Sequence, residues 1–264
     1  MTWRVYLIVC SMVYIIFYQK YHIYHTYPTI RYLCFIYNNI NQHIENNIPF
    51  IHNEYLEIDK YVSRKILLKS HSNHIITILK NFNVLDTTNI PTTKEITIKE
   101  YINNYIDKNN DKYYFKSEDD YQFLKEINLY DKIINKFSKY APTISYQSLS
   151  FWYGVKNTCT PFHYDKDHAN LLYIIEGTKR IYMIHPKYNK FMKGNTEIQY
   201  GASWSECTIS NILKNKNIKY ETIILKKNQI FNIPRYWWHA VINLEQTMAV
   251  TYHYYTISSL LFNF

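Results

Sequence analysis

Cysteine and glycine are scarce in this chain of 264 residues, which contains four of each. No pair of cysteines has the C-x-x-C spacing, and this excludes a zinc ribbon and a thioredoxin-type redox motif. The four cysteines are Cys10, Cys34, Cys159 and Cys207. Although asparagine is abundant, no N-x-Ser/Thr acceptor sequence is present, which favours a domain that does not meet the glycosylation machinery.

Charge is missing from a stretch close to the N-terminus. After Arg4, residues 5–18 carry no charged side chain. As a helix they would span about 21 Å, short of a hydrocarbon core of about 30 Å unless Arg4 reaches toward the interface. No small residues of a cleavage site follow. We expect residues 1–20 to form an uncleaved single-pass membrane anchor of undetermined orientation. If this expectation fails, the protein would be cytoplasmic, with an N-terminal helix packed on the folded domain.

The net charge of +9 is spread along the chain, with lysine-rich patches at residues 187–193 and 214–219. Dispersed lysines are typical of a solvated surface, so nucleic acid is not the expected partner. No internal repeat is present, and the length suits one catalytic domain.

Two short segments carry the pattern of a metal site. They are TPFHYD at residues 160–165 and IPRYWWH at residues 233–239. In an extended strand, side chains at positions i and i+2 leave the same face, so His163 and Asp165 can converge on one ion. A second strand can bring His239 opposite them. Two histidines and one carboxylate with open positions beside them hold catalytic iron(II) in non-haem oxygenases, so these three residues are the candidate ligands.

Further segments around the candidate ligands resemble a known family. They are FWYG at 151–154, NLL at 170–172, EGTKRIYMIHP at 176–186 and ILKKNQIFNIP at 224–234. Together with the ligand segments, they are similar to the cupin-like JmjC family of iron(II)- and 2-oxoglutarate-dependent oxygenases. The family usually has glycine where Asn228 stands, and asparagine tolerates the same left-handed turn.

The resemblance implies how 2-oxoglutarate would be held. In the family its keto-acid end binds iron(II), and a buried cation with hydroxyl donors receives its far carboxylate. Lys179 and Thr160 match those positions, and Tyr146 is a further candidate donor. Asn170 is a candidate contact of the co-substrate, although one extra residue separates it from Asp165. A buried lysine is costly without a carboxylate partner, which gives Lys179 a physical reason to point inward.

Four more polar residues near these segments have other expected roles. Asp167 and His168 fall where the family has a loop, and we expect them in a solvated loop. His253 lies on the final apolar strand and is expected to line the core or the pocket. His185 belongs to a His-Pro turn and is expected to be structural.

The apolar pattern predicts a mainly β fold with flanking helices. Helices are expected at 54–69, at 73–81 and from 119 to 140. Strands are expected at 144–155, 160–165, 170–176, 179–185, 221–225, 229–233, 238–244 and 247–256, with a helical or looped insert near 206–215. This order predicts a double-stranded β-helix, the jelly-roll barrel of cupins, preceded by helices. The expected division is an anchor at 1–20, a connector at 21–50, a helical part of the catalytic unit at 51–141 and the barrel at 142–264.

We therefore expect a dioxygenase that uses iron(II), 2-oxoglutarate and molecular oxygen. The resemblance implies a protein side chain as the substrate, hydroxylated while 2-oxoglutarate is decarboxylated to succinate. Two alternatives stay open. One is demethylation of N-methyl-lysine by the same chemistry, and the other is a cupin-type binding or scaffold module without turnover.

Overall fold

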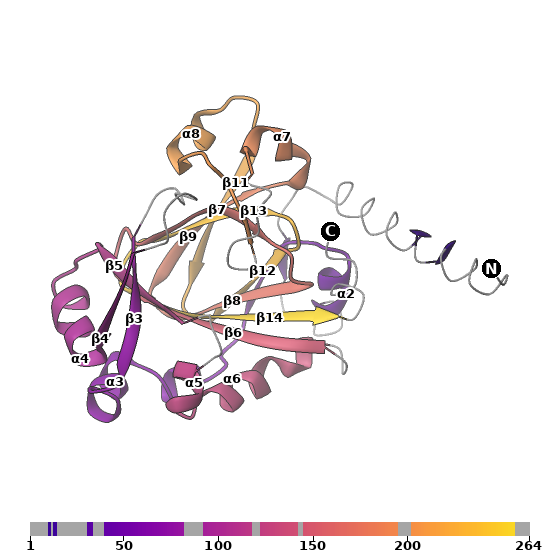
Figure 1. Cartoon of the computed structure of the whole chain (residues 1–264). Helices are drawn as coiled ribbons and strands as arrows, with labels where there is room; N and C mark the ends of the chain where they lie inside the picture. The colour runs from indigo at the N-terminus through magenta and orange to yellow at the C-terminus, as the bar shows by residue number, and fades with distance from the viewer. Residues whose placement is uncertain are drawn as a thin grey trace, which may run out of the picture.

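The structure is a computed structural model that describes residues 10–11, 13–14, 31–33, 40–81, 92–117, 122–141, 145–194 and 202–256. Its strands form a nine-stranded and a five-stranded sheet (Figure 1). In spatial order, the larger sheet contains β1 (Arg31–Leu33), β2 (Phe50–Asn53), β12 (Gln229–Pro234), β8 (Ala169–Glu176), β14 (Thr247–Thr256), β6 (Ser145–Gly154), β5 (Tyr113–Ser117), β3 (Ile75–Lys80) and β4 (Thr93–Thr97). The smaller sheet contains β10 (Ala202–Trp204), β7 (Cys159–Asp165), β13 (Trp238–Asn243), β9 (Thr178–Ile184) and β11 (Tyr220–Lys226).

The predicted jelly-roll barrel is confirmed. Its eight strands lie within one residue of their predicted bounds. Strands β6, β14, β8 and β12 belong to the larger sheet, and β7, β13, β9 and β11 belong to the smaller one. Neighbouring strands within each group of four pair antiparallel. This is the arrangement of a double-stranded β-helix.

The region before the barrel contains more strand than its sequence pattern predicts. The helix expected at 73–81 is wrong, because this segment forms β3 and pairs with β4 and β5. Ile76 and Ile78 are buried while Ile75 is 65% exposed, which is the two-residue period of a half-buried strand. Of the helix expected at 54–69, only α3 (Arg64–Ser70) and a short 3₁₀ turn at Ile58–Lys60 form.

The helix expected from 119 to 140 is split into α5 (Gln122–Glu126) and α6 (Tyr130–Phe137). Asn128, between them, has a φ of 57°, which no α-helix accommodates. Asparagines also take this left-handed conformation at Asn47, Asn109, Asn157 and Asn228. The turn expected at Asn228 is therefore confirmed, and asparagine does in this glycine-poor chain what glycine usually does.

The sheets and helices form layers (Figure 1). Helices α3, α4 (Ile98–Tyr101), α5 and α6 cover the outer face of the larger sheet, where their apolar side chains pack on those of β6, β8 and β14. On the opposite side, α7 (Asn189–Met192) and α8 (Ile209–Lys214) cover the smaller sheet. A separate apolar cluster fills part of the space between the sheets, with Leu172, Ile181 and Phe231 among its members. The remaining interior space holds the polar site described below.

The expected membrane anchor at residues 1–20 is corrected by the structure. Within the described ranges, no helix is both long enough and apolar enough to cross a membrane. From the expected anchor only residues 10–11 and 13–14 are described, and Val13 and Tyr14 are 45% and 68% exposed. The other residues of that segment lie outside the described part of the chain. So does most of the expected connector at 21–50, apart from β1, α2 (Ile40–Glu45) and the residues that follow it. The membrane-associated localisation rested on the anchor and is withdrawn with it.

Candidate metal centre

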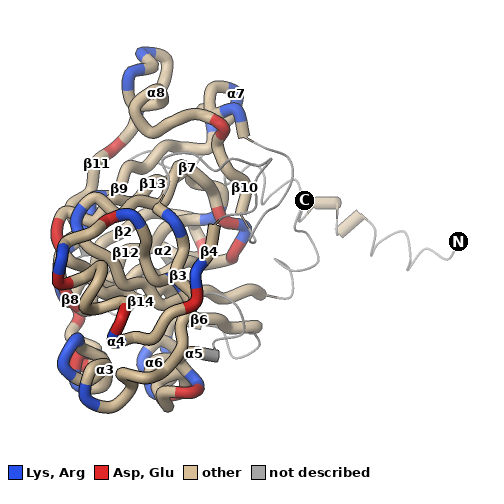
Figure 2. Tube along the Cα trace, turned by 60° about the vertical axis from the view of Figure 1, so that its left-hand side comes forward, with Lys and Arg blue, Asp and Glu red and all other residues tan. Residues whose placement is uncertain are grey.

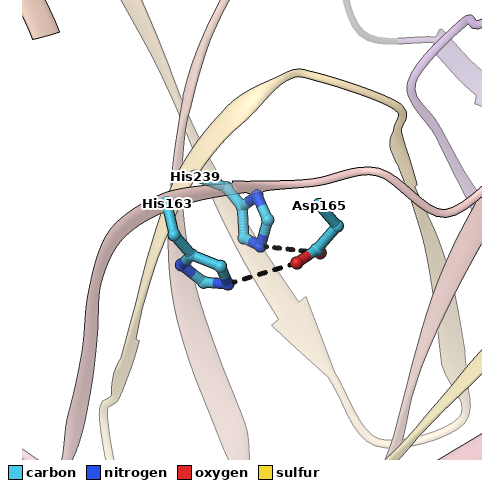
Figure 3. Close-up of side chains that lie close together, drawn as sticks. All are labelled: His163, Asp165 and His239. Carbon is cyan, nitrogen blue, oxygen red and sulfur yellow. Dashed lines mark ion pairs between the residues drawn. The ribbon is translucent and has the colours of Figure 1, made fainter. Parts of the chain in front are cut away.

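His163 and His239 lie opposite each other on two neighbouring strands. Strands β7 and β13 run antiparallel, and their register pairs these two histidines directly. Asp165 follows His163 by two residues, so its side chain leaves the same face of β7. Figure 3 shows the three side chains converging. One potential ligand atom from each residue lies within 4.8 Å of those of the other two.

The distances around the three side chains fit a shared ion better than hydrogen bonds. Asp165 Oδ1 lies 3.8 Å from His163 Nε2, and Asp165 Oδ2 lies 3.5 Å from His239 Nε2. Both separations are long for a hydrogen bond. On the far side of each ring, His163 Nδ1 donates to the Pro161 carbonyl at 2.8 Å, and His239 Nδ1 donates to the Trp237 carbonyl at 3.0 Å. Because a carbonyl only accepts, each ring carries its proton on Nδ1 and turns the lone pair of Nε2 toward the centre.

The surroundings keep His163 neutral. Burial of its ring lowers the pKa of His163 well below its ordinary value, and the neighbouring His239 lowers it further. A neutral imidazole is the form that binds a metal. The ring also stacks on Trp204, with centroids 4.5 Å apart and an angle of 18° between the planes. His163 therefore has a fixed orientation, a fixed tautomer and the protonation state of a ligand.

A strained turn brings the last candidate ligand into place. Tyr236, between β12 and β13, has a φ of 65°, which is rare for a bulky residue. Its backbone N–H donates to the Asp165 carbonyl at 3.0 Å, so the turn is bonded to the strand that carries the other two candidates. The next residue, Trp237, is buried and packs edge-on against His185, with ring centroids 4.9 Å apart. This contact supports the turn and agrees with the structural role expected for His185.

Six of the seven residues predicted for the site line one cavity. They are the three candidate ligands together with Thr160, Lys179 and Asn170. Asn170 Nδ2 donates to Asp165 Oδ2, and the Oδ1 of Asn170 is buried without a hydrogen-bond partner. The amide therefore orients the candidate carboxylate ligand and keeps one acceptor for another group.

Lys179 has the surroundings that an anionic ligand requires. Its side chain is 6% exposed, and its Nζ donates to Asn243 Oδ1 at 2.8 Å. Burial lowers the pKa of Lys179 to about 7. None of the carboxylates in the described ranges pairs with this lysine. Thr160 lies nearby across β13, because β13 is the common neighbour of β7 and β9. The far carboxylate of 2-oxoglutarate would supply the missing charge, so the residues present fit this co-substrate.

Tyr146 does not belong to the cavity. It is 56% exposed near the start of β6 and packs near Tyr255, with ring centroids 6.1 Å apart. The residue of β6 that lines the cavity is Trp152. Six residues along a strand span about 20 Å, so Tyr146 is too far along β6 to reach it.

The expected position in a solvated loop is wrong for Asp167. It is 5% exposed, and its Oδ2 accepts a hydrogen bond from His253 Nδ1 at 2.7 Å. His253 lines the cavity and stands opposite Asn170 in the register of β14 and β8. The expectation that His253 lines a pocket is met. His168 points elsewhere and contacts Glu45, with its Nε2 3.3 Å from Glu45 Oε1.

Among the residues of the cavity wall that were not predicted are Lys116, Trp152 and Trp204. Lys116 belongs to β5, a strand inside a region expected to be helical, and its Nζ lies 4.7 Å from the ring centroid of Trp152. Trp204 belongs to β10, which is too short to show a strand period. Of these three residues, only Trp152 lies in a segment that resembles the family, the segment FWYG, so only its place beside the ligands had a signal in the sequence.

Comparisons with known proteins agree with this geometry. The profile of the cupin-like domain family matches residues 49–259. The chain is similar to the JmjC domain-containing protein D of Dictyostelium discoideum, with 33% identity over 107 residues, which are 39% of this chain and 24% of that protein. It is also similar to the lysine-specific demethylase JMJ30 of Arabidopsis thaliana, with 29% identity over 111 residues, covering 40% of this chain and 25% of that protein.

A further relative is the HSPB1-associated protein 1 of Rattus norvegicus, with 29% identity over 106 residues, covering 38% of this chain and 22% of that protein. The chain thus spans about a quarter of the length of the curated relatives that it matches.

Proposed function

Because the chain belongs to the cupin-like domain family, we propose that it is an iron(II)- and 2-oxoglutarate-dependent dioxygenase that hydroxylates a protein side chain. The JmjC members of this family are typically oxygenases or demethylases that use these two cofactors. The proposal for this chain rests on its own residues, because the matched relatives are distant and much longer.

One observation carries the proposal. A single cavity contains two imidazoles and a carboxylate aimed at one point, and a buried lysine that has no carboxylate of its own in the described residues. The first set suits iron(II), and the second suits the far carboxylate of 2-oxoglutarate. When bound, iron(II) and 2-oxoglutarate would supply the reduction of oxygen: 2-oxoglutarate would lose carbon dioxide and take one oxygen atom to become succinate, and the other oxygen atom would enter a substrate C–H bond.

The chain's own residues would position the cofactors and exclude water. His163, Asp165 and His239 would hold the metal, with both imidazoles oriented by backbone carbonyls. Lys179 and Thr160 would orient the co-substrate. Apolar and aromatic side chains on the same wall, such as Leu172, Ile233 and Trp204, would keep bulk water from the reacting atoms.

The cavity favours a neutral or acidic side chain over a methylated lysine. Asp165 is the one carboxylate among the described residues that line it, and it is a candidate ligand. A methylammonium group binds against the faces of aromatic rings. In this cavity Lys116 already lies over the ring of Trp152, and the ring of Trp204 already stacks on His163. With two lysines in the wall, a cationic substrate gains no attraction there. These contacts support hydroxylation over demethylation.

The same cavity argues against a scaffold without turnover. A charged lysine buried beside a neutral amide destabilises the fold, and binding of a protein partner at the surface would not require it. A co-substrate carboxylate gives Lys179 a role.

The proposal is tested with purified protein loaded with iron(II) under anaerobic conditions. After addition of 2-oxoglutarate, oxygen and pools of unmodified and N-methyl-lysine peptides, mass spectrometry follows the peptides and succinate. We expect succinate together with a peptide that gains one oxygen atom, and neither product with His239→Ala. Loss of a methyl group from a lysine peptide would favour the demethylase instead. Bound iron without succinate would favour the scaffold.

A further inference from the structure

The segment between β9 and β11, residues 185–219, contributes to the cavity and also carries a concentrated charge; we call it the basic insert. The structure describes its residues 185–194 and 202–219. Its strand β10 pairs with β7 so that Trp204 stands opposite His163 and Ala202 opposite Asp165. Both Trp204 and Ala202 line the cavity. The basic insert is thus one wall of the proposed active site.

The charge of the basic insert is mainly positive. It contains two glutamates, Glu197 and Glu206, and six lysines, which are Lys187, Lys190, Lys193, Lys214, Lys216 and Lys219. All six lysines are exposed. Figure 2 shows their positions on α7, α8 and the adjoining turns, at one end of the molecule.

These lysines form no ion pair in the described residues, unlike several basic residues on other parts of the surface. Ion pairs in the described ranges hold Lys60, Arg64, Lys136, Lys139 and Lys227, and none of them involves a lysine of the basic insert. Their positive field is therefore not compensated by neighbouring carboxylates within the described residues. Such a surface attracts anionic partners and raises their rate of association.

The lysines are attached to a packed unit that is bonded to the cavity wall. Ser205, which follows Trp204, bridges to Gly194, and its Oγ donates to the Met192 carbonyl at 2.5 Å. The Glu206 N–H donates to the Lys193 carbonyl at 3.1 Å. Met192 also packs with side chains of α8 and with the outer face of β7. A partner bound to these lysines would therefore be held close to the wall of the proposed active site.

We infer that the basic insert is a docking surface for an acidic segment of the protein substrate. This inference rests on the proposed function, because it takes the substrate to be a protein side chain presented to the cavity. Lysines are compact charges that suit carboxylates along a flexible chain, whereas recognition of single-stranded nucleic acid also uses exposed aromatic rings and arginine. The basic insert has no arginine, and none of the aromatic rings in its described part is exposed. Lys187 and Lys190 lie over the rings of Tyr188 and Phe191.

The inference is tested by binding, which needs no turnover. Fluorescence anisotropy compares a labelled oligo-glutamate peptide with a labelled oligouridylate RNA of the same length at physiological salt. The test variant carries Lys190→Glu, Lys193→Glu and Lys214→Glu. The matched control carries Lys65→Glu, Lys69→Glu and Lys99→Glu, three exposed lysines on α3 and α4. Both variants change the net charge equally.

We expect the insert variant to bind the peptide at least about fivefold more weakly than the control variant does, because three favourable charges become repulsive. Equal loss in both variants, or no binding of the peptide to the wild type, would overturn the inference. Insert-dependent binding of the RNA in place of the peptide would also overturn it. Docking with no succinate formation would leave the inference standing and remove the proposed catalysis, so the two failures are distinguishable.

Discussion

Lys179 faces Asn243 across strands β9 and β13, and its ammonium group donates to the amide oxygen of that residue at 2.8 Å. The pair explains how a lysine can be buried in this barrel before any ligand binds. An amide satisfies one of the three N–H donors but supplies no negative charge. Burial therefore disfavours the charged form and lowers the pKa of Lys179 to about 7. A bound carboxylate ligand would stabilise the charged form of Lys179 and raise its pKa again.

The first prediction concerns the affinity for 2-oxoglutarate. Lys179→Ala should weaken it roughly 10- to 150-fold, because a charge-assisted hydrogen bond worth about 1.5–3 kcal/mol is lost. Thr160→Val should weaken it less, since a neutral hydroxyl contributes about 1 kcal/mol. Apparent constants for 2-oxoglutarate at saturating iron measure both. If the affinity of Lys179→Ala equals that of the wild type, another cation holds the co-substrate, and Lys116 is the other lysine of the cavity wall.

The same lysine predicts a pH dependence. Below pH 7, Lys179 is charged before the co-substrate arrives, and above pH 7 it must take up a proton on binding. The affinity for 2-oxoglutarate should therefore fall as the pH rises above 7, by up to about tenfold per pH unit. Calorimetry at pH 8 in two buffers of different ionisation enthalpy should detect the proton uptake. Lys179→Arg should abolish it, because arginine stays charged. Absence of uptake in the wild type would show that Lys179 does not pair with the ligand.

Trp204 is predicted to be a positioning residue for His163. Its ring stacks on the imidazole at 4.5 Å, a contact worth about 0.5–1.5 kcal/mol. Trp204→Ala should weaken iron(II) binding roughly 2- to 13-fold, whereas Trp204→Phe should preserve most of the affinity. The rate of iron release to a chelator measures this without turnover. Equal release rates in all three proteins would assign Trp204 to packing alone.

His253 is predicted to contact the substrate. It lines the cavity, and its Nδ1 donates to Asp167, which fixes the orientation of the ring in the cavity wall. His253→Ala should lower the amount of hydroxylated peptide formed per succinate. When the substrate is poorly held, succinate can form without hydroxylation of the peptide. The affinity for 2-oxoglutarate should change little. His168→Ala is the matched control, since His168 contacts Glu45. An unchanged ratio in His253→Ala would exclude the contact.

The barrel was predictable because its strands repeat a simple pattern. The bounds of strands β7 and β13 can be recognised in the sequence. Side chains two residues apart on a strand leave the same face, and this alone places His163 beside Asp165. Residues 73–81 were not predictable in the same way, because short apolar runs fit a helix and a strand equally well. Only pairing with β4 and β5 decides for the strand.

The parts of the site that the sequence did not predict depend on contacts between distant segments. Asp167 looks like a loop residue until β14 brings His253 to it. Trp204 becomes a neighbour of His163 only through the pairing of β10 with β7. Tyr146 was expected in the site only because its strand lines the cavity. That strand, β6, is ten residues long, and Tyr146 lies near its start, too far from the cavity to contact it. Local pattern therefore predicted the candidate ligands, and tertiary packing determined the wall around them.

The most direct test follows the fate of oxygen in a single turnover. Wild-type protein and the His239→Ala variant are given iron(II), 2-oxoglutarate and isotopically labelled oxygen gas, and succinate is analysed by mass spectrometry. The wild type should bind a single iron per chain and form succinate that carries one labelled oxygen atom, while His239→Ala should bind no iron and form none. Full iron occupancy in His239→Ala, or an iron-loaded wild type that forms no labelled succinate, would contradict the account.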